Sequence, residues 1–413
     1  MTLDSAPATH ASVLRGTTVW FMALAAALGT ASIYPLQPAI ADVAGNLDVS
    51  VTTTGFALAF GPVGYLVGLA VLVPLVDRFP PRCVLAAQFC VLAMALAANA
   101  IAGTTWLLGL AVGIIGAAST VGAQLSSVAA RFAHPRRRAT VLGIVTAGIS
   151  AGIIGGRLIG GWLTDVFGWR GALLVFAIGC LGLAAVSLSV LPTTRASITT
   201  GYLATLRGMP GLFGRFRTLR LAAGRGALWF FSFCAVWSGL AVALAQPPFS
   251  YSAEQIGLFA IAGLSGIVAT RIAGAWTDRV GARTVIIVGL VVAALAAAVL
   301  AAWLSNTAIT LLCLALFDAG LFAAQVANQS TVLAIDPAAP AQFNGAYMVV
   351  YFIGGSLGTA FGAAAVEWFG WPATAAVTAA VIAVALVITA AVSTPSTPAE
   401  PRPTARRETV DER

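Results

Sequence analysis

The stretch Gly274-Ala-Trp-Thr-Asp278-Arg279-Val-Gly281-Ala-Arg283 separates two long apolar runs of the chain. Each run contains about 20 apolar residues, which is the length a helix needs to cross the hydrocarbon core of a bilayer. Ionised side chains are costly inside that core, so the charged stretch belongs at a membrane surface. We therefore predict a charged hinge between two membrane-spanning helices.

The same kind of segment occurs 201 residues earlier (278 − 77 = 201), as Val73-Pro-Leu-Val-Asp77-Arg78-Phe-Pro80-Pro-Arg82. A second match lies in two glycine-rich segments that end in Gly-Trp and are 202 residues apart (371 − 169 = 202). This register pairs Gly152, Gly156, Gly160 and Asp165 with Gly354, Gly358, Gly362 and Glu367. The chain therefore contains one unit written twice.

The composition is that of a polytopic membrane protein, with 59% hydrophobic residues, 9% charged residues and a mean hydropathy of +0.95. All 22 basic residues are arginines, and the net charge of +8 comes from inter-helix segments and tails. This placement favours membrane orientation over nucleic-acid binding. The five cysteines show neither disulfide nor metal-ligand spacing, so we expect no metal, no cofactor and, without a catalytic constellation, no enzyme.

Twelve apolar segments are long enough to span a membrane. Their expected limits are 17–40, 52–76, 83–103, 106–131, 139–166, 170–191, 226–249, 254–277, 283–304, 307–334, 342–368 and 371–393. The expected organisation is a cytoplasmic tail (1–16), a six-helix bundle (17–191), an arginine-rich cytoplasmic connector (192–225), a second six-helix bundle (226–393) and a disordered cytoplasmic tail (394–413). The positive-inside rule places both termini in the cytoplasm, because nearly all arginines fall on one side.

The pattern Gly-x-x-x-Asp-Arg-x-Gly-x-Arg between a second and a third helix resembles the loop signature of the major facilitator superfamily. The later copy has both glycines, Gly274 and Gly281, whereas Val73 and Pro80 replace them in the earlier copy. The resemblance extends over all twelve segments. It implies an all-helical fold of two six-helix bundles, related by an axis along the membrane normal, with a substrate site between them.

Gly148, Gly152, Gly156 and Gly160 recur every four residues and so line one face of the fifth helix, where another helix can approach closely. The block Gly152-x-x-x-Gly156-Arg157-x-x-Gly160-Gly161 resembles the fifth-helix signature of drug:proton antiporters, with arginine where proline is expected. The resemblance implies a relative of that branch, close to arabinose-efflux-like permeases. It favours a structural or gating role for Arg157, at the interface of the halves, over direct substrate contact.

Asp318 is the only carboxylate predicted near mid-membrane, about eleven residues into the tenth segment and roughly 16 Å deep at 1.5 Å per residue. A proton-coupled transporter needs a group that is neutral in one access state and charged in the other. We interpret Asp318 as the proton-coupling site; a structural hydrogen bond or ion pair is the alternative. Arg271 is expected to extend its charge to the nearby cytoplasmic surface.

In this superfamily the first, fourth, seventh and tenth helices line the cavity, and the eleventh carries a similar tyrosine pattern. The resemblance therefore nominates, as cavity residues beside Arg157, Tyr34, Gln37, Gln124, Trp237, Gln246, Gln325, Asn328, Tyr347 and Tyr351. A conformational switch is expected at the fifth-helix signature and the two hinges, which contribute Gly156, Arg157, Asp77, Arg78, Arg82, Asp278, Arg279 and Arg283.

These observations predict a bacterial inner-membrane transporter that works by alternating access as a monomer in the lipid bilayer. The resemblance implies proton-coupled efflux of a small organic molecule. Uptake or exchange of an organic or inorganic anion is an alternative, because Arg157 and Arg271 supply positive charge. A membrane sensor that does not transport is the alternative from another class.

Overall fold

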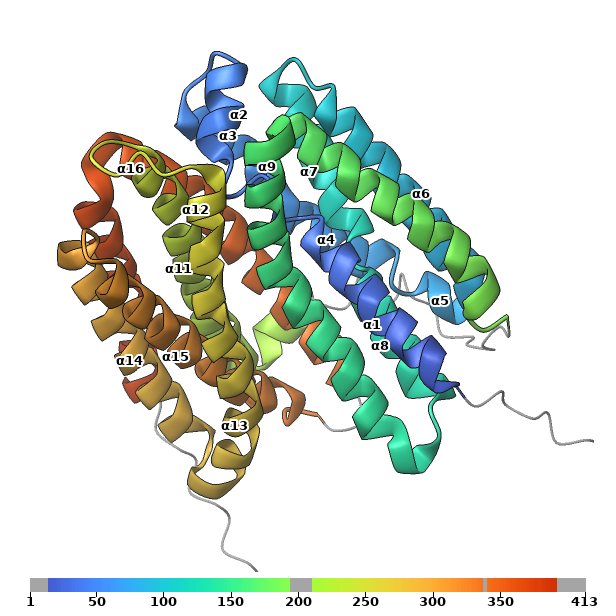
Figure 1. The fold of residues 1–413 in the computed structure, drawn as a ribbon. Coiled ribbons are helices and arrows are strands. Elements are labelled where there is room, and N and C mark those ends of the chain that lie inside the picture. Colours follow the sequence, from blue (N-terminus) through green and yellow to red (C-terminus); the bar gives the residue numbers. More distant parts are fainter. Residues whose placement is uncertain (1–13, 194–209, 337–339, 392–413) are drawn as a thin grey trace, which may run out of the picture.

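The computed structural model describes residues 14–193, 210–336 and 340–391, and these residues form helices and connecting turns without a strand (Figure 1). The first half contains α1 (Gly16–Ala31), α2 (Ile40–Asn46), α3 (Val51–Leu58), α4 (Phe60–Val71), α5 (Leu75–Arg78), α6 (Pro81–Ala100), α7 (Thr105–Ala118), α8 (Val121–Phe132), the 3-10 turn η1 (Pro135–Arg137) and α9 (Arg138–Val190). The second half contains α11 (Arg217–Ala245), α12 (Ala253–Leu258), η2 (Phe259–Gly263), α13 (Leu264–Val280), α14 (Ala282–Trp303), α15 (Thr307–Leu333) and α16 (Pro340–Ala391).

Nine helical segments among the described residues are long and apolar enough to cross a membrane. Two of them, in α9 and α16, turn back at Gly168 and Gly370, whose φ angles of 73° and 76° suit glycine, so each supplies two crossings. Seven single crossings, these two pairs and the shorter helix α1 make the twelve crossings that the sequence predicts. The all-helical membrane fold is therefore confirmed.

Each half has its own hydrophobic core. One core draws on buried residues between Val19 and Leu191, and the other on buried residues between Leu219 and Ala385. Only Ile40 and Ala253 belong to the core of the opposite half. The two-bundle arrangement thus follows from two separate sets of packed apolar side chains.

Glycines on α9 bring this helix into backbone contact with α1. A Cβ at Gly152 or Gly156 would overlap the carbonyl oxygen of Ala27 or Ala31. In a lipid environment, close backbone approach of this kind stabilises helix pairs through van der Waals packing. The four-residue glycine spacing in the sequence therefore marks a real helix–helix contact.

The second half repeats this contact between α16 and α11. Gly354, Gly358 and Gly362 lie against the backbone of Ala227, Phe231 and Ala235. Each glycine of this set has a counterpart 202 positions earlier in α9. The internal duplication predicted from the sequence is thus present in the packing.

Two predicted helix limits differ from the structure. The first expected span, 17–40, is interrupted after Ala31 by turns and resumes at Ile40, because Pro35 and Pro38 cannot donate helical backbone hydrogen bonds. The seventh span begins at Arg217, nine residues before its expected start at 226 (226 − 217 = 9).

The early start of α11 has a packing reason. Leu219, Ala222 and Ala223 are buried on one face of the helix, so the exposed Arg220 between them does not prevent helix formation. Arg220 instead donates to the carbonyl oxygens of Phe213 and Gly214. The expected connector therefore includes helical residues, and its residues 194–209 lie outside the described part of the chain.

The bundle has two distinct ends. We call the end that carries the hinge carboxylates Asp77 and Asp278 the hinge end, and the end that carries Asp165 and Glu367 the acidic end. At the acidic end α12 packs against α9, and α3 packs against α16. Toward the hinge end the two halves diverge, with α13 on one side and α1, α8 and the start of α9 on the other (Figure 1).

The glycine contact predicts a position-specific effect on stability. Gly152→Ala should lower the free energy of unfolding by about 1–3 kcal/mol, because the added methyl group overlaps the backbone of α1. Thermal unfolding in detergent measures this effect. Gly143→Ala, in the same helix with no atom within 4 Å of the added Cβ, is the matched control, and equal effects of the two substitutions would contradict the contact.

Candidate functional site

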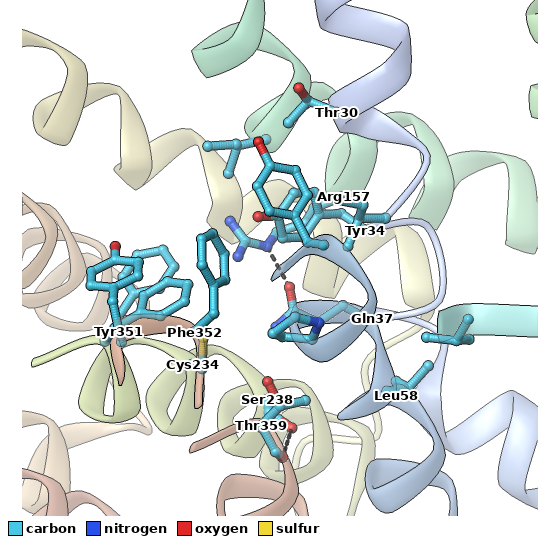
Figure 2. Close-up of a pocket in the computed structure, with 18 of the residues that line it drawn as sticks. Thr30, Tyr34, Gln37, Leu58, Arg157, Cys234, Ser238, Tyr351, Phe352 and Thr359 are labelled. Carbon is cyan, nitrogen blue, oxygen red and sulfur yellow. Dashed lines mark hydrogen bonds between the residues drawn. The ribbon is translucent and has the colours of Figure 1, made fainter. Parts of the chain in front are cut away.

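A cavity of about 210 Å³ lies between the two halves, in the middle of the bundle. Figure 2 shows the side chains that face it, from the first half on one side and from α11 and α16 on the other. The lining residues are Thr30, Ile33, Tyr34, Gln37, Leu58, Gly61, Pro62, Tyr65, Val112, Ile149, Ile153, Arg157, Phe230, Phe233, Cys234, Ser238, Phe322, Tyr351, Phe352 and Thr359.

Arg157 is the cationic residue of this cavity and is only 4% exposed. Its Nε donates a hydrogen bond of 2.5 Å to Oε1 of Gln37. The guanidinium carbon lies 4.7 Å from the ring centre of Tyr34 and 4.4 Å from that of Trp237. Aromatic faces attract a desolvated cation, so these rings hold the guanidinium in place.

The remaining guanidinium nitrogens of Arg157 donate to no acceptor among the described residues. No carboxylate of the described residues lies within ion-pair distance of the Arg157 guanidinium. Figure 2 shows the guanidinium projecting into the space between the halves. Arg157 therefore presents unused hydrogen-bond donors and a positive charge to the cavity.

Asp318 lies on α15 in the second half and is 2% exposed. Its Oδ1 accepts a hydrogen bond of 3.3 Å from Nε1 of Trp237. Arg157 packs on the face of the same indole ring, and both ionisable residues line a smaller cavity of about 40 Å³. One tryptophan thus connects the cation of the first half to the carboxylate of the second.

Glycines make room for both ionisable groups. Gly156 lies against the backbone of Ala31, which brings α9 close enough to α1 for Arg157 to reach Gln37. A Cβ at Gly263 would lie 3.3 Å from Oδ2 of Asp318, so the glycine leaves that oxygen its space.

Aromatic rings from both halves border the cavity. Phe230 and Tyr351 stack with ring centres 4.1 Å apart, within the second half. Tyr65 of the first half meets Phe352 of the second at 5.0 Å. Such a lining binds apolar or aromatic ligand surfaces, while a few polar groups set the orientation of the ligand.

The structure brings some of the predicted cavity residues together and leaves others apart. Tyr34, Gln37, Arg157 and Tyr351 line the main cavity, and Trp237 lines a small adjoining one. The predicted residues that line none of the described cavities are Gln124, Gln246, Gln325, Asn328 and Tyr347.

Several of these outlying residues are engaged elsewhere. Gln325 accepts hydrogen bonds from Trp229 at 2.8 Å and from Tyr347 at 2.5 Å. Asn328 donates to the carbonyl of Ala222 at 2.9 Å. This network lies within the second half, where it satisfies buried polar groups. Gln124 similarly donates to the carbonyl of Leu72 at 2.7 Å.

The predicted switch residues at the hinge end make contacts within their own halves. Asp77 pairs with Arg131 at 3.3 Å, and Arg283 donates to the carbonyl of Ala390 at 2.7 Å. The other hinge residues, Arg78, Arg82, Asp278 and Arg279, are exposed. These contacts accompany the divergence of the halves at this end.

Sequence reasoning missed a group of lining residues on the second, seventh and eleventh crossings. They include Tyr65, Phe230, Phe233, Cys234 and Phe352. The available signal was the spacing of Phe230, Phe233 and Cys234, which share one helix face. Arg131, the partner of Asp77, was also missed.

A model of the major facilitator superfamily matches residues 19–359 and 226–411 of the chain. The uncharacterized transporter YgaY of Escherichia coli O157:H7 is 30% identical over 355 residues, covering 85% of this chain and 89% of that protein. A chloramphenicol resistance protein of Streptomyces lividans is 30% identical over 178 residues, covering 41% of this chain and 44% of that protein. The crystal structure of the nucleoside transporter NupG (D323A mutant) superposes with a TM-score of 0.76 at 15% identity, covering 91% of this chain and 98% of that chain.

The geometry of Arg157 predicts that the fold does not depend on its charge. Arg157→Met removes the contacts of the guanidinium with the aromatic rings and with Gln37, which destabilises the fold. It also removes the cost of burying a positive charge, which stabilises the fold by a similar amount. The free energy of unfolding should therefore change by less than about 1 kcal/mol. Thermal unfolding measures this change, with Arg271→Met, at an exposed site on α13, as the control. A loss of about 2–5 kcal/mol, typical of core truncation, would instead show that Arg157 holds the fold.

Proposed function

The chain belongs to the major facilitator superfamily, and from this premise we propose that it exports a small organic molecule in exchange for protons. Family membership makes the chain a multi-pass membrane transporter and not an enzyme. The proposal adds the coupling ion, the direction of transport and the residues that take part. Alternating access around the central cavity is the mechanism.

The placement of Asp318 carries the proposal. Its carboxyl group is buried between the halves and contacts Trp237, which also contacts Arg157. A charged Asp318 partly compensates the positive charge of Arg157, whereas a protonated Asp318 leaves that charge uncompensated. Binding of one proton therefore changes the electrostatic field that a substrate meets in the cavity.

Efflux is supported by similarity to a protein named for chloramphenicol resistance. The cavity is also suited to a small organic molecule, because aromatic rings and a few polar side chains line it. These observations and the fifth-helix sequence around Gly156 and Arg157 support the proposal that the protein is a relative of the drug:proton antiporter branch, close to arabinose-efflux-like permeases.

We propose that the hinge end faces the cytoplasm of a bacterium and that the protein acts as a monomer in the inner membrane. The arginines gather at this end, as the positive-inside rule requires. Both termini would then be cytoplasmic, and residues 394–413 would form a cytoplasmic tail. The described conformation, closed at the acidic end and divergent at the hinge end, is then inward-facing.

The hinge charges would act when this conformation changes. In the described state Asp77 is paired within the first half and Asp278 is exposed. Closure of the hinge end would bring these carboxylates close to helix ends of the opposite half. Arg78, Arg82 and Arg279 would approach new partners in the same step, and Arg283 would exchange the carbonyl of Ala390 for another one.

A second candidate function is uptake or exchange of an organic or inorganic anion. The observation that favours it is the set of unused donors on Arg157. A carboxylate or phosphate could accept hydrogen bonds from two of them at once. In this alternative, protonation of Asp318 would remove a negative charge near the anion and so strengthen its binding. The bound anion would in turn favour protonation of Asp318.

Asp318→Asn tests the proton site. The substitution keeps the shape of the side chain and a hydrogen-bond acceptor for Trp237 but removes the titratable proton. Transport driven by a pH gradient should fall to background, while substrate binding persists. An internal pH dye in proteoliposomes measures proton movement as cationic, neutral and anionic compounds are added.

Asp48→Asn, which removes an exposed carboxylate at the acidic end, is the control for this assay. Full gradient-driven transport by Asp318→Asn would rule out the proton site. Binding without proton movement in the wild-type protein would favour a non-transporting sensor.

Arg157→Gln separates the two candidate functions. If the substrate is an anion, the variant should lose binding of anionic compounds by about tenfold or more, because charge-assisted hydrogen bonds are lost. Binding of neutral and cationic compounds should change much less. Arg271, which the sequence nominated beside Arg157 for the anion alternative, is exposed on α13 and does not line the main cavity. Arg271→Gln therefore serves as the matched arginine control, and an equal loss for all three compound classes would count against the anion alternative.

A further inference from the structure

Two carboxylates at the acidic end each bind the opposite half of the protein. Oδ2 of Asp165, in the first half, accepts a hydrogen bond of 3.2 Å from the backbone N–H of Glu254 in the second half. Oε2 of Glu367, in the second half, accepts one of 2.7 Å from the N–H of Thr52 in the first half. The two bonds therefore cross the interface in opposite directions.

Both N–H groups belong to the first turn of a helix that starts at the acidic end. Thr52 lies in the first turn of α3 and Glu254 in the first turn of α12. The N–H groups of a first turn lack partners within the helix, and the helix end carries a partial positive charge. A carboxylate from the opposite half supplies both an acceptor and the complementary charge.

The two contacts are built from the same positions of the repeated unit. Asp165 and Glu367 are 202 residues apart (367 − 165 = 202), and so are Thr52 and Glu254 (254 − 52 = 202). The same separation relates further pairs of the two copies, namely the helix-capping serines Ser50 and Ser252, the positive-φ residues Asp48 and Ser250, the helix glycines Gly55 and Gly257, and the turn glycines Gly168 and Gly370.

The two halves approach each other closely about one helical turn away from each crossing contact. A Cβ at Gly257 would overlap the backbone carbonyl of Arg157, and one at Gly55 would overlap the side chain of Ala363. Asp165 is eight residues beyond Arg157 on the same helix (165 − 157 = 8), about 12 Å along the axis. Separation at this end would therefore move the helix that carries the cavity arginine.

Neither Asp165 nor Glu367 has an arginine partner within ion-pair distance among the described residues. Partial burial raises the pKa of Asp42, on α2, and the negative charge of nearby Asp165 raises it further. Asp42 and Asp165 thus lie close together within the first half, and the two helix starts provide hydrogen-bond donors for Asp165 and Glu367.

We propose that Asp165 and Glu367 form a duplicated latch that keeps the acidic end closed. Each carboxylate caps a helix start in the opposite half, and both caps must separate before the acidic end can open. The proposal rests on alternating access as proposed above. It holds that the hydrogen bonds of Asp165 to Glu254 and of Glu367 to Thr52 stabilise the closed state of the acidic end. The sequence repeat supplies both of them.

Removing the charge of either carboxylate should weaken closure. Asp165→Asn and Glu367→Gln keep side-chain shape but lose the charge that faces the helix start. Each substitution should raise the equilibrium constant for opening by about fivefold, the usual scale of a charged helix cap. The double variant should show roughly the product of the two effects, because the sites share no described contact.

Access to the cavity from each membrane face measures opening. Thr359 lines the cavity and is partly exposed, so Thr359→Cys is the probe position in a protein whose five native cysteines are replaced by alanine. A membrane-impermeant thiol reagent is applied to right-side-out and inside-out vesicles. The labelling rate from the acidic end should rise in each latch variant and most in the double variant, while labelling from the hinge end falls.

Asp42→Asn is the matched control, because Asp42 is a neighbouring carboxylate with no described bond to the opposite half. An unchanged labelling pattern in a folded double variant overturns the latch, and so does an equal rise in the control. Thermal unfolding establishes that each variant is folded. Labelling reports access and not transport, so a failure of the proton-exchange proposal leaves this result interpretable.

Discussion

Burial of two ionisable side chains between the halves of a membrane protein is the constraint on which the centre of this structure depends. Arg157 cannot lose its charge, and a charge inside a bilayer is costly unless the protein supplies partners. Here the partners are one amide, from Gln37, and the faces of aromatic rings, including Trp237. Asp318 reaches the same tryptophan from the other half. The two opposite charges therefore share a partner without forming a direct ion pair, so either charge can change its environment when the halves move.

The internal repeat divides the protein into duplicated and unique parts. The glycine contacts between helices, the glycine turns and the latch carboxylates all occur twice, about 202 residues apart. The central residues do not. The position 202 residues after Arg157 is Thr359, and the position 202 residues before Asp318 is Gly116. The contacts that pack the bundle and those proposed to close its acidic end occur in both copies of the repeat. The buried cation Arg157 and the buried carboxylate Asp318 each occur in only one copy. Such asymmetry is what a cavity needs if it is to orient a substrate between two similar halves.

The sequence was sufficient for the features that depend on composition and periodicity. Twelve apolar segments predicted the crossings, the four-residue glycine spacing predicted a close helix contact on that face of α9, and the rarity of charges in apolar segments drew attention to Arg157 and Asp318. The sequence could not predict the hydrogen-bond partners of buried polar side chains when those partners are distant in the chain. Gln124 satisfies the carbonyl of Leu72, where the second crossing breaks before Pro74. Gln325 similarly bonds to Trp229 and Tyr347. Either glutamine could have faced the cavity on helical spacing alone, because spacing does not say which buried polar groups will meet.

The central claim is that the carboxyl group of Asp318 exchanges a proton while buried beside Trp237 and Arg157. Infrared difference spectroscopy of the protein in lipid, recorded between high and low pH, detects the carbonyl band of a protonated carboxyl group directly. The account predicts a band that appears at low pH in the wild-type protein and is missing from Asp318→Asn, with the bands of surface carboxylates common to both. Identical difference spectra for the two proteins would show that Asp318 does not titrate, and would contradict the account.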